Sequence, residues 1–125
     1  MSLNFNNMER RYIDVPAPYF GDSVVIRVNK RAVKHYMKAS KLAIMIADRK
    51  DIHADDRVAY VLAVVFMSVC TIPVTGEYAF ADEQIDDLVN HLPRDLYENL
   101  AAAAFELDPI ITDEPKTLTA KKKKS

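Results

Sequence analysis

The sequence contains few of the residue types on which many small enzymes and secreted domains depend. Its 125 residues include one cysteine, two glycines and no tryptophan. A single cysteine, Cys70, excludes an intrachain disulfide and a cysteine-based zinc site within one chain. The two glycines, Gly21 and Gly76, stand too far apart to form a phosphate-binding glycine loop. These absences argue against the common nucleotide-binding and metal-binding designs, and the cysteine usage fits a reducing compartment.

The sequence also lacks an apolar run long enough for a comfortable membrane span. Its most hydrophobic segment covers residues 58–72 and includes a serine and a threonine, whereas a transmembrane helix needs about 20 apolar residues. The first residues contain no apolar signal-peptide region. Half of the residues are hydrophobic and 28% are charged, so we expect a soluble, cytoplasmic protein with no membrane partner.

Charge is distributed unevenly along the chain, although the formal net charge is only −1. Residues 24–50 contain eight lysine or arginine residues and one acid, whereas residues 77–114 contain eleven acids and one base. Charge segregation of this kind favours complementary association, either within the fold or between copies of the chain.

The pattern of extended and helical segments predicts a mainly α fold. We expect a small N-terminal β-hairpin or strand pair, for which the β-branched "SVVIRV" is a strand candidate, followed by a compact bundle of about four helices. A flexible N-terminus is predicted over residues 1–8, a single domain over residues 9–108, and a disordered tail over residues 109–125 that ends in a lysine run. The helices are expected near residues 30–47, 54–70, 82–92 and 94–107.

The first helix is predicted to be amphipathic. Asn29 can cap its start, and its mainly apolar and basic residues separate onto different sides. The mainly apolar set is Val33, Tyr36, Met37, Ser40, Ile44 and Ala47. The basic stripe is Lys30, Arg31, Lys34, Lys38 and Lys41. Because His35 stands among these lysines, we expect it at the surface.

The basic stripe has three interpretations. The plainest is a solvated helix face, and the second is docking to the acidic region, with Asp82, Glu83, Asp86 and Asp87 as the candidate partners. The third is nucleic-acid binding, which a stripe of cations would support. Nucleic acid ranks last, because the net charge is not basic and no aromatic residue interleaves with the stripe to stack on bases. Asp82 is also positioned to cap the third helix.

No catalytic, cofactor or metal site is predicted, and we expect a protein that is not an enzyme. The histidines, His35, His53 and His91, share no metal-ligand spacing with one another or with Cys70. Asp87 and His91 are four residues apart and could bind a metal in principle, but a solvated polar face explains them better. Cys70 lies among valine, phenylalanine and methionine, where cysteine behaves as a small hydrophobic residue.

The stretch from Asp56 to Leu107 has a distinctive order of elements. An apolar helix is followed by a segment around a glycine ("PVTGEYAFADEQ"), an acidic amphipathic helix, a Leu-Pro break and an alanine-rich helix. This order resembles the tail assembly chaperones of long-tailed (siphovirus/lambda-like) bacteriophages, and the preceding "SVVIRVNKRAVKHYMKAS" suits the N-terminal part of that family. The sequence departs from the family at "TIPVTGEY", where a more acidic turn is common, and at its Asn-rich N-terminus.

The resemblance implies a non-enzymatic assembly factor that acts in the host cytoplasm and is absent from the mature virion. Such a chaperone would bind the tape-measure protein, keep it soluble, and help to recruit the major tail (tube) protein during tail morphogenesis. A longer frameshifted form of the chaperone, sharing its N-terminus, is a further implied partner. We expect a hydrophobic groove that receives an apolar helix. We also expect homo-oligomers in which residues 24–50 of one copy meet residues 77–114 of the next.

The lysine run from Lys121 to Lys124 suggests a hypothesis about the gene. Consecutive lysine codons are runs of adenine, on which paired transfer RNAs can slip by one base, so the run would mark a programmed frameshift site. Lysine codons interrupted by scattered AAG, or a −1 reading frame that does not stay open beyond Ser125, would contradict this hypothesis. A solubilising tail is the alternative. Two other functions stay open: a small nucleic-acid-binding regulator that uses helix 30–47, and a structural head–tail connector subunit.

Overall fold

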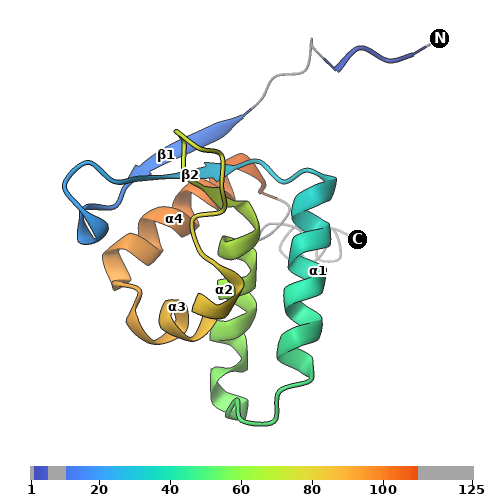
Figure 1. Cartoon of the computed structure of the whole chain (residues 1–125), viewed down its shortest axis with the longest axis vertical. Helices are drawn as coiled ribbons and strands as arrows, with labels where there is room; N and C mark the ends of the chain where they lie inside the picture. Colours follow the sequence, from blue (N-terminus) through green and yellow to red (C-terminus); the bar gives the residue numbers. More distant parts are fainter. Residues whose placement is uncertain (1, 6–10, 110–125) are drawn as a thin grey trace, which may run out of the picture.

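The structure is a computed structural model that describes residues 2–5 and 11–109 (Figure 1). Over this part of the chain, two N-terminal antiparallel strands are followed by four α-helices, as the sequence predicted, and a short third strand between the second and third helices joins the sheet. The mainly α fold with an N-terminal strand pair is therefore confirmed. The predictions for residues 1 and 6–8 of the N-terminal segment and for residues 110–125 of the tail, including its lysine run, concern residues outside the described ranges.

The sheet is built around a central strand. Strand β1 (Tyr12–Pro16) pairs with β2 (Val25–Asn29), and β2 pairs in turn with a short third strand, β3 (Cys70–Thr71). The sequence did not predict β3. The side-chain amide of Asn29 donates hydrogen bonds to the Val69 carbonyl and the Thr71 hydroxyl, both at 2.9 Å. The expectation that Asn29 caps a helix is therefore wrong, because its amide fixes β3 against β2.

The four α-helices of the described chain form two groups. Helices α1 (Val33–Ala47) and α2 (Arg57–Val69) lie side by side as a hairpin, and α3 (Ile85–His91) packs against α2 (Figure 1). Helix α4 (Arg94–Leu107) packs against β1 and β2. Short 3₁₀ turns precede α2 and α3. The turn between β3 and α3 needs a glycine, because Gly76 has a φ of 73°, which other residues rarely adopt.

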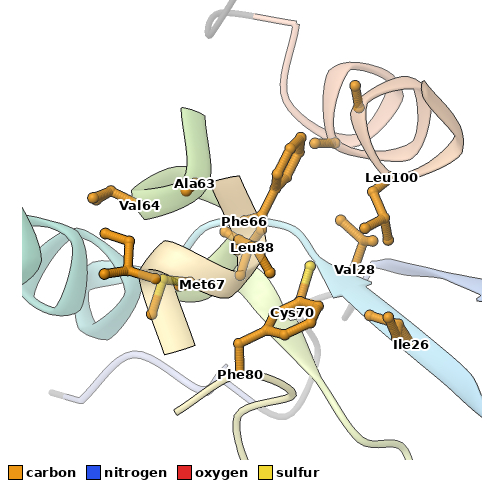
Figure 2. Close-up of a cluster of buried hydrophobic side chains, with 14 of the residues drawn as sticks. Ile26, Val28, Ala63, Val64, Phe66, Met67, Cys70, Phe80, Leu88 and Leu100 are labelled. Atoms are coloured by element: carbon orange, nitrogen blue, oxygen red, sulfur yellow. The ribbon is translucent and has the colours of Figure 1, made fainter. Parts of the chain in front are cut away.

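The core lies where α2, α4 and the sheet converge. Figure 2 shows side chains from α2, β2, α3 and α4 meeting around Met67 and Cys70. Met67, Cys70 and Leu100 are fully buried, and the rings of Phe66 and Tyr97 meet edge to face with centroids 5.4 Å apart. Burying a large apolar side chain contributes about 1.5–3 kcal/mol, so this convergence is the main source of stability.

Helix α1 turns a different side to the core than the sequence indicates. It buries His35, Leu42 and Ile46, while Val33 and Met37 of the predicted apolar set are 77% and 67% exposed. The physical reason is the width of the apolar arc on α1. One neighbouring helix, α2, covers only part of that arc, and the remainder faces solvent.

The expectation that His35 lies at the surface is also wrong. The residue is only 4% exposed, and its Nδ1 accepts a hydrogen bond of 2.7 Å from the backbone N–H of Ala32. Ala32 occupies the cap position of α1 but has no oxygen in its side chain. His35, the third residue of the helix, therefore reaches back and accepts from the backbone N–H of the cap residue, as a glutamate or glutamine does at this position in a capping box.

Candidate partner-binding surface

Helix α2 carries a row of apolar side chains on the side that no other described element fully covers. Val58, Val61, Leu62 and Val65 recur at the spacing that places residues on one helix face; we call this row the α2 stripe. Val58 and Val61 are 70% and 58% exposed, and Leu62 and Val65 are half-buried. The stripe therefore remains available for a contact outside the described fold.

A groove runs along one side of the α2 stripe, between α2 and the α3–α4 corner. Its volume is about 400 Å³, and Val58 and Leu62 line it together with Val89, Leu92 and Tyr97. Almost all of its lining is apolar, with the side chain of Arg94 as the one charged member. We call it the α3–α4 groove.

A smaller groove lies on the other side of the stripe, between α1 and α2. Its volume is about 210 Å³, and Ala43 and Ala47 of α1 face Val61 of α2 across it. Arg57 is the one charged residue in its lining. Ile44, which follows Ala43 on α1, is 64% exposed, so the apolar surface continues from this groove onto α1. Exposed apolar patches bounded by polar residues commonly mark contact sites for other proteins or ligands.

The basic stripe predicted from the sequence is largely neutralised within the chain. Arg31 pairs with Asp108 at 2.9 Å. Lys38 forms an ion pair with Asp82, and Lys41 lies 3.5 Å from the same carboxylate. The ammonium groups hold the pKa of Asp82 below its ordinary value, chiefly through the hydrogen bond from Lys38. The basic and acidic regions thus meet inside the fold, which is one of the two associations that their charges allowed.

Asp82 does not act as the predicted helix cap. The cap position before the 3₁₀ turn belongs to Ala81, whose N–H donates to the side chain of Gln84 at 2.8 Å. Asp82 instead turns toward α1, because two lysines there offer a charged partner.

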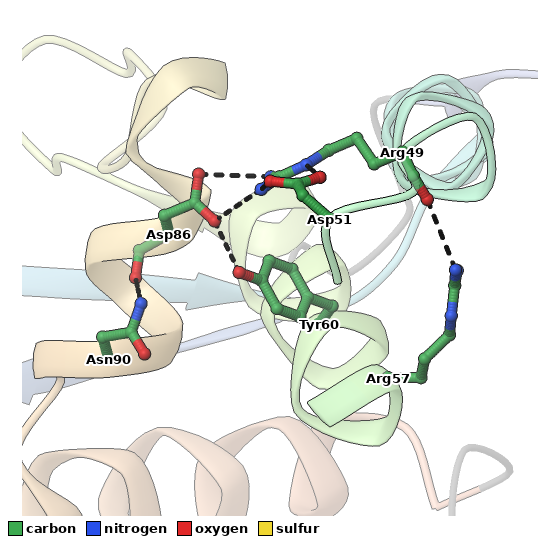
Figure 3. Close-up of polar contacts among 6 residues, drawn as sticks. All are labelled: Arg49, Asp51, Arg57, Tyr60, Asp86 and Asn90. Atoms are coloured by element: carbon green, nitrogen blue, oxygen red, sulfur yellow. Dashed lines mark hydrogen bonds and ion pairs between the residues drawn. The ribbon is translucent and has the colours of Figure 1, made fainter. Parts of the chain in front are cut away.

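A second cluster ties the end of α1 to α3 (Figure 3). Arg49 donates two hydrogen bonds of 3.1 Å to Asp86 and two more to Asp51, at 2.9 and 2.7 Å. The hydroxyl of Tyr60 also donates to Asp86. The hydrogen bonds from Tyr60 and Arg49 lower the pKa of Asp86, while the carboxylate raises the pKa of Tyr60. This cluster fixes the hairpin against α3, so its groups serve the fold.

The remaining predicted site residues are exposed, and the two lysines among them lie away from the two acids. Lys30 and Lys34 flank the start of α1, whereas Glu83 and Asp87 lie at the start of the acidic helix. Asp87 lines an apolar hollow of about 320 Å³ beside Tyr19, Phe20 and Phe80. The nine charged residues singled out from the sequence therefore do not form one surface.

The one cysteine of the chain is not placed to act as a nucleophile. Cys70 is fully buried, and loss of solvation raises the pKa of its thiol to about 12, so the nucleophilic thiolate is not available near neutral pH. Within residues 2–5 and 11–109, no group of three or more His, Cys, Asp or Glu side chains is placed to hold a metal ion. No helix in the same ranges is long and apolar enough to cross a membrane.

The sequence predicts that α2 is apolar almost all round, but it does not show which face of the helix stays uncovered. The indication that some face would need a further partner is the composition of α2, which has no charged residue after Arg57. Such a helix needs neighbours on several sides, and the described chain supplies them on only some.

No family model, curated protein or solved structure matches this chain. The α2 stripe with its flanking grooves is therefore the feature on which a functional assignment depends.

Proposed function

We propose that this protein is a non-enzymatic assembly chaperone of a long-tailed phage, which binds apolar helices of the tape-measure protein through the α2 stripe. The observation that carries the proposal is the stripe itself, exposed between two apolar grooves. The resemblance of residues 56–107 to tail assembly chaperones supplies the biological setting. The chaperone would keep its client soluble in the host cytoplasm and help to recruit tail-tube subunits.

The geometry suits a helix as the client. An α-helix is about 10–12 Å across with its side chains, and helix-in-groove binding uses apolar anchors at intervals of three and four residues. The α2 stripe presents its own valine and leucine side chains at the same intervals, so ridges of the client could pack beside them. The α3–α4 groove, with Phe66 and Tyr97 in its wall, would receive the largest anchor.

The intramolecular ion pairs change the proposed mode of self-association. Arg31, Lys38 and Arg49 each have a carboxylate partner within the chain, so these three charges are not available for head-to-tail stacking of copies. Copies arranged along a client, or joined to the longer form, would instead make contact through apolar surface. The same pairing leaves the nucleic-acid-binding alternative without the continuous basic stripe that it needs.

The proposal predicts a tape-measure gene beside the gene for this chain, and co-expression of the two products tests it. We expect the wild-type chain to keep the tape-measure protein in the soluble fraction and to co-purify with it. Leu62→Glu, which places a charge in the stripe beside the α3–α4 groove, should abolish both effects. Val74→Glu is the matched control, because Val74 is 94% exposed in the turn after β3. Equal rescue by the Leu62→Glu variant would refute the proposal.

A further inference from the structure

A third groove of the described chain is basic rather than apolar. It has a volume of about 510 Å³ and lies between the β2–α1 connection and the turn after β3. Arg11, Arg27, Lys30 and Lys34 line it, together with the buried His35. No carboxylate is among the described residues of its lining.

Three of these four cations are not neutralised by described residues. Arg27 donates two hydrogen bonds to Asp14, at 2.8 and 3.0 Å, and its charge is balanced there. Within residues 2–5 and 11–109, no carboxylate lies within ion-pair distance of Arg11, Lys30 or Lys34. The basic stripe is therefore divided. Its other members form ion pairs with distant carboxylates, whereas Lys30 and Lys34 line one groove together with Arg11.

The groove also presents hydrogen-bond donors besides the cations. The Nδ1 atom of His35 accepts from the N–H of Ala32, so the neutral ring carries its proton on Nε2 and can donate there. Burial, and then the charge of Lys34, lowers the pKa of His35 and keeps this form. The start of α1 lies in the same lining, and its cap residue, Ala32, has no side-chain oxygen to accept from the first-turn N–H groups; this adds the positive end of a helix dipole.

We propose that this groove binds a phosphate-bearing anion with two linked phosphate groups, of the pyrophosphate type. Three cations that have no carboxylate partner among the described residues exceed what a single carboxylate would balance, and lysine ammonium groups bind phosphate as point charges. Of the two guanidinium groups in the lining, Arg27 is already paired with Asp14, whereas Arg11 has no carboxylate partner among the described residues and can contact two phosphate oxygens at once. The volume lies within the range of small-molecule sites, about 300–1,000 Å³. This site is separate from the α2 stripe and does not depend on the proposed chaperone function.

The test is a titration of the full-length protein followed by NMR of its backbone amides. Inorganic pyrophosphate should shift the signals of Ala32, Lys34 and Gly76 in a saturable way. Lys34→Gln should weaken binding about tenfold, the loss of one charge-assisted contact. Lys50→Gln makes the same charge change at an exposed position beyond the end of α1 and should change the affinity less than twofold.

A parallel titration with ADP distinguishes the two sources of the phosphates. Equal affinity for both probes assigns the site to the diphosphate group alone, and tighter binding of ADP assigns it to a nucleotide; either result supports the proposal. Three results would overturn it: no saturable shift, an equal loss in the two lysine variants, or displacement of pyrophosphate by a glutamate-rich peptide at lower concentration. Circular dichroism of both variants verifies that the fold is intact.

Discussion

Replacing the exposed valines of α2 with threonine should remove partner binding while leaving the fold almost unchanged. The double variant Val58→Thr/Val61→Thr keeps the shape and the β-branching of both side chains, so that helix propensity changes little. It replaces one methyl group with a hydroxyl at each of two positions in the α2 stripe, Val58 beside the α3–α4 groove and Val61 beside the groove between α1 and α2. Both residues are mostly exposed in the free protein, so the change in the free energy of unfolding should stay within about 0.5 kcal/mol per site.

The effect on binding follows from the same exposed fractions. Complete burial of a valine side chain contributes about 1.5–3 kcal/mol. Since 70% of Val58 and 58% of Val61 remain exposed, a docked helix would bury most of this remainder, at about 1 kcal/mol for each residue. Each threonine loses the burial of one methyl group, worth about 0.8 kcal/mol, so together with the cost of desolvating the hydroxyls the double variant should bind about 2 kcal/mol more weakly, or about thirtyfold in Kd.

The assay is fluorescence anisotropy with labelled peptides that tile the apolar helices of the tape-measure protein. Val74→Thr is the control, because it makes the same chemical change at a 94% exposed position away from the stripe. The double variant should bind about thirtyfold more weakly than wild type, and the control should bind as wild type does. Retained affinity in the double variant, or an equal loss in the control, would refute the assignment of the α2 stripe as the contact surface.

Three further predictions concern the fold and its association. Asp86→Asn weakens the hydrogen bonds from Tyr60 and Arg49 and should cost about 1 kcal/mol in urea unfolding at neutral pH. Folding lowers the pKa of Asp86 below its ordinary value of 3.8, so the contribution of Asp86 to the free energy of unfolding is complete above pH 3.8 and is lost as the pH falls through the folded-state pKa. Stability of the Asp86→Asn variant should therefore fall less steeply in acid than that of the wild type. An identical pH profile of stability would contradict this. Leu100→Ala, at a fully buried position, should cost about 2–5 kcal/mol in the same measurement, and a cost below 1 kcal/mol would show that the core is packed differently. Self-association, followed by sedimentation, should persist or strengthen as salt is added, because apolar contacts rather than ion pairs would join the copies; dissociation at high salt would favour the charge-stacking arrangement instead.

The elements that sequence reasoning predicted well are those with a strong local signal. The β-branched run before Asn29, the apolar helix that contains Phe66 and the stripe from Leu96 to Leu107 each formed where their patterns indicated. Local sequence therefore determined the type of all three elements. For the stripe from Leu96 to Leu107 it also determined the buried side, whereas for the helix with Phe66 it did not identify the uncovered face.

The elements that it missed depend on distant partners. Strand β3 has only two residues, and it exists because β2 and the amide of Asn29 hold it in place. The buried side of α1 was misjudged because its apolar arc is wider than α2 can cover, so the helix pattern alone could not select the buried part. His35 was assigned to the surface because its lysine neighbours are charged, yet its ring turns inward to cap its own helix.

The candidate surfaces could be predicted only in part for the same reason. The sequence identifies cations and acids but not their pairing, and the pairing of Lys38 with Asp82 and of Arg31 with Asp108 joins residues far apart in the chain. The α2 stripe becomes visible as a surface only when the positions of α1, α3 and α4 show which side of α2 stays open.

The most direct test of the central claim is an NMR titration of the methyl-labelled full chain with the peptide that binds most tightly in the anisotropy assay. The account predicts that the methyl signals of Val58, Val61 and Leu62 shift together and saturate, while those of Val74 do not move. Shifts confined to residues away from α2, or none at a peptide concentration that saturates the anisotropy signal, would contradict it.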